Sequence, residues 1–164
     1  LDQVLDFGAN YTVKAQIVSE HGEKSNPIEF QFATIPLEEE RVWVEVILGT
    51  EQKVVVYKGK KVIKTMLCSG GTPDEPTILG TYYIQDRGTE FFSQKYKEGA
   101  TYWIRFQGNY LFHSVPRDEN WVIKKEEEDK IGTPASHGCI RLVESDAKWL
   151  YENIPQNTMV IIHE

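Results

Sequence analysis

Hydrophobic and polar residues alternate along several short segments of the chain, and this period of two predicts β-strands. After residue 41 such strand patterns cover residues 42–48, 53–57, 62–67, 80–86, 102–106 and 110–113. Stretches rich in Gly, Pro and Asp separate them, for example residues 70–76. A near-continuous apolar run at 159–162 is short enough for a buried final strand. The pattern therefore predicts a domain that is mainly β.

One helix is predicted near the end of the chain. Its apolar residues follow the helical spacing i, i+3, i+4, i+7 at Ala147, Leu150, Tyr151 and Ile154. Ser145 is expected to cap its first turn and Pro155 to mark its end. The charged run at 124–130 is expected to be a solvated loop or helix face.

Residues 1–36 form a different region. Strand patterns at 11–18 and 28–32 flank a polar stretch, which predicts a β-hairpin. This hairpin resembles the last two strands of a fibronectin type III domain, so we expect residues 1–36 to be the C-terminal part of such a domain, truncated at its front. An ordinary first hairpin of a single domain is the alternative. Residues 37–40 are expected to be a linker, and 41–164 the main domain.

An isolated two-stranded hairpin is marginally stable in water. We therefore expect the apolar face of the 1–36 hairpin to be covered, either by the domain that follows or by a second copy of the chain in a homodimer. Light scattering would test the second arrangement.

Charge and composition narrow the classes of function. The 164 residues include 18 Lys+Arg and 25 Asp+Glu, which gives a net charge of −7 and makes a nucleic-acid partner unexpected. No apolar run approaches the roughly 18 residues that span a bilayer, so membrane insertion is not expected, and the start of the chain has no signal-peptide pattern. The two cysteines are too few for a disulfide scaffold, and no metal or cofactor is expected. Cys68 is expected to be a buried strand thiol.

The segment Ser136-His137-Gly138-Cys139 carries the strongest chemical signal. A thiolate attacks carbonyl carbons, and a nearby imidazole that takes the thiol proton raises its reactivity. Gly138 leaves room for a substrate carbonyl, and the N–H groups of Gly138 and Cys139 are candidate donors to an oxyanion. Spacing alone leaves both His113 and His137 open as the base, because alternate residues of an extended segment share a face.

Together with Phe112-His113-Ser114 upstream and Arg141 downstream, this segment closely resembles the L,D-transpeptidase catalytic domain, over residues 41–163. Stretches at 70–73, 80–84, 146–151 and 158–161 also fit the family pattern. The resemblance implies an L,D-transpeptidase-like β-sandwich with one or two helices near the cysteine. The spacing departs from the family because 22 residues separate His113 from Ser136. The excess falls in the charged loop 117–131, which we expect to border the substrate groove.

The resemblance also implies roles for individual residues. Cys139 would be the nucleophile, His113 the general base, and Ser114 the residue whose backbone carbonyl orients the imidazole. His137 would lie close to Cys139 on the oxyanion side. Residues expected to contact substrate are Ser136, Arg141 and Tyr82, and for Arg141 a packing ion pair is an equal alternative.

The activity implied is transfer of an acyl group between peptidoglycan stem peptides, with release of D-Ala and formation of 3-3 cross-links, outside the cytoplasmic membrane. Carbapenem-type β-lactams would acylate the same cysteine. Three alternatives stay open at this point. The chain could be a purely hydrolytic cysteine peptidase or amidase, a non-catalytic cell-wall binding module, or a metal site built from His113, His137 and Cys139.

Overall fold

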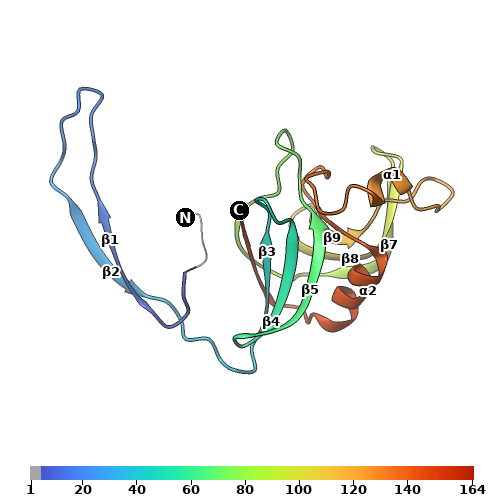
Figure 1. The fold of residues 1–164 in the computed structure, drawn as a ribbon, viewed down its shortest axis with the longest axis horizontal. Helices are drawn as coiled ribbons and strands as arrows, with labels where there is room; N and C mark the ends of the chain where they lie inside the picture. Colours follow the sequence, from blue (N-terminus) through green and yellow to red (C-terminus); the bar gives the residue numbers. More distant parts are fainter. Residues whose placement is uncertain (1–4) are drawn as a thin grey trace. The chain divides into compact units, whose positions relative to one another are not determined.

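The computed structural model describes residues 5–164 and divides the chain into two compact units, one ending at Glu38 and one spanning Glu39–Glu164. The first unit is a hairpin of two antiparallel strands, β1 (Asn10–Ala15) and β2 (Ile28–Ala33) (Figure 1). Tyr11 lies opposite Phe32, and their rings stack with centroids 5.6 Å apart. The predicted hairpin is thus observed, while its fibronectin-like origin and its covered face stay predictions. The first four residues of the region 1–36 lie outside the described residues.

The second unit is built on a curled sheet with the strand order β6-β11-β3-β4-β5-β10-β9-β8-β7 (Figure 1). The prediction of a mainly β domain is confirmed. Most neighbouring strands are antiparallel, but β11 runs parallel to β3 and β10 runs parallel to β9. The strands are β3 (Val42–Ile47), β4 (Lys53–Lys58), β5 (Lys61–Ser69), β6 (Gly80–Tyr83), β7 (Arg87–Ser93), β8 (Glu98–Gln107), β9 (Tyr110–Ser114), β10 (Ile140–Leu142) and β11 (Met159–His163).

The core of this unit lies between the curled sheet and helix α2 (Glu144–Asn153), which contacts β8, β9 and β10. Alternate strand residues point into it, as the period of two requires. Phe106 and Phe112 are its largest members, with ring centroids 5.2 Å apart. From α2, Ala147 and Leu150 are buried. Cys68 of β5 is fully buried there, as expected for a strand thiol.

Two local features differ from the sequence prediction, the cap of α2 and two additional strands. Val143, not Ser145, holds the N-cap position of α2, and no side chain caps the helix. Strands β7 and β10 were not predicted as strands. Strand β10 is only three residues long and pairs with β9, which is distant in sequence, so tertiary pairing and not local alternation defines it. The charged run contains a single short turn of helix, α1 (Lys125–Glu128).

Among residues 5–164, no helix is long and apolar enough to cross a lipid bilayer.

Candidate active site

The parallel pairing of β10 with β9 brings the two predicted catalytic residues to one face of the sheet. Ile140 lies opposite Phe112, and Arg141 lies opposite His113. Ile140 and Phe112 point into the core, so the alternate residues of both strands point to the opposite face. Cys139, the residue directly before β10, and His113 of β9 therefore lie on the same side of the sheet.

That face forms the floor of a cavity of about 430 Å³. Cys139, His113, Arg141, Ser136 and His137 all line it, so five of the residues singled out in the sequence meet here. The other lining residues come mainly from β7, β8 and the turn between them, and they are Phe91, Ser93, Lys95, Tyr96, Glu98, Gly99, Ala100, Asn109, Leu111 and Pro116.

His113 is buried, and one of its ring nitrogens is held by the chain. Its Nδ1 lies 2.6 Å from the backbone oxygen of Ser114. A carbonyl oxygen only accepts hydrogen bonds, so Nδ1 carries the proton and Nε2 is the free acceptor of the neutral ring. The edge of the Phe91 ring packs on the imidazole with centroids 5.5 Å apart. The ring is therefore fixed in the tautomer that a general base needs.

The pKa of His113 is lowered to about 4, mainly by burial and to a smaller extent by the positive charge of Arg141, against the raising effect of the Ser114 hydrogen bond. The imidazole is therefore neutral at neutral pH.

Cys139 is half-buried, and its sulfur lies over the start of β9. The thiol donates a hydrogen bond to the backbone oxygen of Asn109 at 3.5 Å. Burial raises the pKa of Cys139, while a hydrogen bond from the Leu111 backbone and the charge of Arg141 act in the lowering direction. The resting pair at neutral pH is thus a thiol and a neutral imidazole, in which proton transfer accompanies attack.

The turn from Ser136 to Cys139 is fixed by side-chain hydroxyl groups. The Ser136 hydroxyl accepts a hydrogen bond from Gly138 N at 3.0 Å and donates one to the Cys139 carbonyl. Ser136 is 1% exposed, and its hydroxyl is engaged within the turn. The Gly138 N–H, one of the two predicted oxyanion donors, is therefore already engaged, and an oxyanion would share it with Ser136.

Gly138 has φ +112°, a conformation that side chains rarely adopt, and a Cβ there would lie 2.7 Å from Cε1 of Tyr110. We expect Gly138→Ala to destabilise the fold by about 1–3 kcal/mol through backbone strain alone, with a further loss from the clash. Gly132→Ala is the matched control, because Gly132 has φ +100° but open space around it. Denaturant unfolding of both variants measures the difference. Equal losses of stability would show that the Tyr110 contact has no effect.

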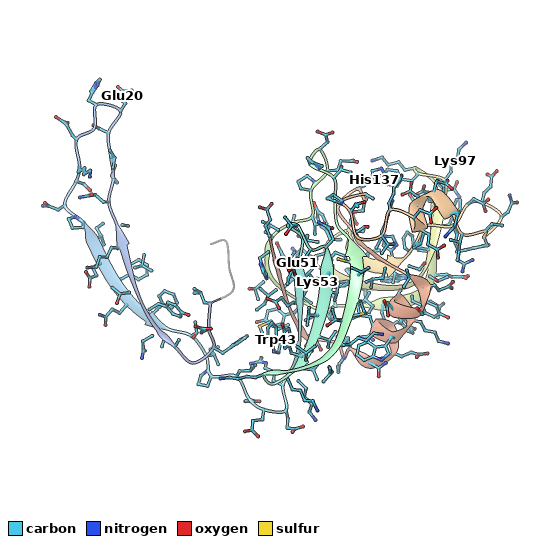
Figure 2. All side chains as sticks on the ribbon, viewed as in Figure 1. Glu20, Trp43, Glu51, Lys53, Lys97 and His137 are labelled. Atoms are coloured by element: carbon cyan, nitrogen blue, oxygen red, sulfur yellow. The ribbon has the colours of Figure 1, made fainter. Side chains whose placement is uncertain are left out.

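His137 lies at the mouth of the cavity and is about half exposed. Its ring stacks on Tyr96 with centroids 4.4 Å apart, and its Nε2 lies 3.6 Å from Oε2 of Glu75. Figure 2 shows His137 on the same side of the unit as Lys97, which lies in the turn between β7 and β8. His137 therefore joins two loops at the rim, whereas His113 is buried in the floor.

Arg141 is 5% exposed and makes ion pairs with Glu127 of α1 and, at 3.8 Å, with Glu98 of β8. It also donates a hydrogen bond to the Ala135 carbonyl. The packing role weighed for it in the sequence is thus present. Its buried Nε has no hydrogen-bond partner among the described residues. The charged loop contacts the cavity wall through Glu127, which the sequence could not specify.

Three predicted residues do not line the cavity, and they are Gly138, described above, Ser114 and Tyr82. Ser114 is buried beneath it, and its hydroxyl accepts a hydrogen bond from Thr101 N at 2.9 Å. Tyr82 packs against the core near Phe106, and its hydroxyl donates to the Leu79 carbonyl. Substrate contact by Tyr82 stays a prediction without support from its position.

Thr77 was missed by the sequence analysis. Its hydroxyl donates a hydrogen bond to the Gly138 carbonyl, 61 residues away, and this pairing has no local signal in the sequence.

In the part of the chain that the structure describes, no group of three or more His, Cys, Asp or Glu side chains is placed to hold a metal ion. His113, His137 and Cys139 are accordingly not brought together as such a group. Both cysteines are free thiols.

Cys139, directly before β10, and the buried His113 of β9 thus line one cavity on a curled β-sheet. Comparison with known proteins identifies the family. Residues 41–162 match the L,D-transpeptidase catalytic domain. The chain belongs to the L,D-transpeptidase family.

Individual relatives agree with this assignment. The chain is 46% identical over 132 residues to a Bacillus subtilis (strain 168) protein named "Putative L,D-transpeptidase YciB", covering 77% of this chain and 68% of that protein. It is 35% identical, with a TM-score of 0.60, to a Clostridium acetobutylicum ATCC 824 structure described as a fused Zn-dependent amidase/peptidase/peptidoglycan-binding domain-containing protein. That match covers 75% of this chain but 52% of the other, so the chain spans about half the length of the clostridial protein.

A third similar structure is L,D-transpeptidase 3 from Mycobacterium tuberculosis in complex with a faropenem-derived adduct. It is 22% identical with a TM-score of 0.58, and the match covers 84% of this chain and 64% of that one. At this identity the likeness concerns the fold.

Proposed function

We propose that this chain is a peptidoglycan L,D-transpeptidase that works through an acyl-enzyme on Cys139. The observation that carries the proposal is the cavity that Cys139 and the buried His113 both line, with Nδ1 of His113 held by the Ser114 carbonyl so that Nε2 is the free base. The family assignment supports the same chemistry.

In the first stage His113 Nε2 takes the thiol proton while the sulfur attacks the carbonyl carbon between the third, diamino residue of a stem tetrapeptide and its terminal D-Ala. The oxyanion that forms accepts hydrogen bonds from backbone N–H groups of the 138–139 turn. As the oxyanion collapses, the peptide C–N bond breaks, His113 returns the proton to the leaving amine, and D-Ala departs. A thioester on Cys139 remains.

In the second stage an amine of another stem peptide attacks the thioester and gives its proton to His113. The sulfur leaves, takes up that proton, and the new amide is a 3-3 cross-link. Water in place of the amine would give hydrolysis. A substrate of this kind is found outside the cytoplasmic membrane, where we propose that the enzyme acts.

The test is intact-protein mass spectrometry after incubation with a carbapenem. Wild type is expected to gain one stable adduct, and Cys139→Ala none. The adduct on a relative, L,D-transpeptidase 3, motivates this probe. An adduct on both proteins, or on neither, would contradict the proposal.

Product analysis with a stem tetrapeptide then separates the two fates of the thioester. Cross-linked dimers with free D-Ala identify a transpeptidase, whereas tripeptide with free D-Ala and no dimer identifies a hydrolase.

A further inference from the structure

The buried hydroxyl of Thr77 ties the proposed catalytic turn to the loop before β6. Thr77 is 6% exposed, and its Oγ1 donates a hydrogen bond to the Gly138 carbonyl at 2.8 Å. The same oxygen accepts one from Gly71 N at 2.9 Å. The Thr77 hydroxyl thus accepts a hydrogen bond from the backbone of its own loop and donates one to the proposed catalytic turn.

The loop that carries this hydroxyl is itself fixed against the turn. Ser136 N donates to the Gly70 carbonyl at 2.9 Å, and Thr72 N donates to the Ser136 carbonyl at 3.0 Å. The loop that carries Thr77 is therefore already hydrogen-bonded to the turn at Ser136. The Thr77 hydroxyl adds a further hydrogen bond to the turn, at Gly138.

The carbonyl of Gly138 and the N–H of Cys139 belong to one peptide unit. The described chain has no cis peptide bonds, so this unit is trans and planar, and its C=O and N–H point in opposite directions. Whatever holds the carbonyl therefore also aims the N–H. Thr77 does not line the cavity, whereas Cys139 does.

We propose that Thr77 is a positioning residue that aims the Cys139 N–H at the oxyanion formed during acylation. The proposal rests on the proposed function of Cys139. It matters because the other candidate donor, Gly138 N–H, already bonds to Ser136 Oγ at 3.0 Å. Without the Thr77 hydroxyl the 138–139 peptide can tilt, and the donor loses its alignment with the developing charge.

Two reactions of the same sulfur separate this role from a general structural one. A carbapenem is attacked at a carbonyl, so an oxyanion forms before the β-lactam C–N bond breaks. Iodoacetamide is attacked at a saturated carbon, where the S–C bond forms as iodide leaves and no oxyanion appears. Thr77→Val removes the hydroxyl at nearly constant shape, and Thr77→Ser retains it.

We expect Thr77→Val to slow acylation of Cys139 by about tenfold or more, up to the 10²–10³-fold that follows loss of a whole oxyanion donor. Alkylation by iodoacetamide should stay at the wild-type rate. Thr77→Ser should restore acylation. The proposal would be overturned if Thr77→Val slowed acylation and alkylation equally or left acylation unchanged. It would also be overturned if Thr77→Ser did not restore acylation.

Cys68 reports whether the fold survives, because it is fully buried and burial raises its pKa to about 12. Peptide mapping should find iodoacetamide on Cys139 alone in every folded variant. If Thr77→Val is labelled at Cys68, Thr77→Ala makes the same comparison without a methyl group against the carbonyl. Failure of the proposed function has a different signature, since wild type itself would then be alkylated at Cys139 but not acylated.

Discussion

Cys139→Ser is expected to lower the rate of stem-peptide turnover by a factor on the order of 10⁴ or more, as removal of a nucleophile does in other acyl-transfer enzymes. The oxygen analogue fails because a serine hydroxyl is far less acidic than a thiol. The base that would have to deprotonate it, His113, has a pKa lowered to about 4 by burial. A base this weak suits a thiol and not an alcohol.

The measurement is release of D-Ala from a tetrapeptide under steady-state conditions, with the carbapenem adduct followed in parallel. The matched control is Cys68→Ala, which alters the other cysteine of the chain. Cys68 lies in the core and does not line the cavity, so its variant should keep activity while losing stability. If Cys139→Ser retained substantial turnover, Cys139 would not be the nucleophile.

The parts of this site that the sequence predicted are those marked by residues that are neighbours along the chain. Cys139 follows Ser136-His137-Gly138 directly, and the strand pattern at 110–113 placed His113 at the end of a strand. Likeness to a family then favoured His113 over His137 as the base, a choice that spacing alone left open. The structure adds a physical difference between the two, since His113 is buried in the floor of the cavity and His137 is exposed at its rim.

The parts that were missed depend on contacts between segments that are distant in sequence. The bond of Thr77 to the Gly138 carbonyl and the ion pair of Arg141 with Glu127 arise only once loops fold over the sheet. No periodicity marks such contacts, because one hydroxyl or one carboxylate is enough to make them. The Ser145 cap failed for a related reason: α2 begins at Glu144, and Val143, two residues before Ser145, takes the cap position directly after β10.

His113→Ala is expected to reduce kcat/KM by a factor on the order of 10⁴, close to the loss for Cys139→Ser, because a nucleophile and its base fail as a unit. His137→Ala should cost much less, because it removes the stacking on Tyr96 and the contact with Glu75 but no proton acceptor in the floor of the cavity. Steady-state kinetics of the two alanine variants make the comparison. A larger loss for His137→Ala would reverse the assignment of the base.

The pH dependence gives a second, independent readout of His113. A base must be neutral to accept a proton, and with a folded pKa of about 4 the wild-type kcat/KM should fall on the acid side near pH 4, well below the 6.5 of an ordinary histidine. The free energy of unfolding is expected to change with pH in the same direction, decreasing toward acid. Because the pKa is lowered on folding, the contribution of the neutral ring is complete above pH 6.5 and declines as pH falls through about 4.

The free energy of unfolding of His113→Ala should therefore fall less steeply with acid than that of wild type between those two pH values. Denaturant melts at several pH values would measure both. An acid limb near pH 6.5 in wild-type activity would contradict the assignment of His113 as the base, because its pKa is lowered to about 4.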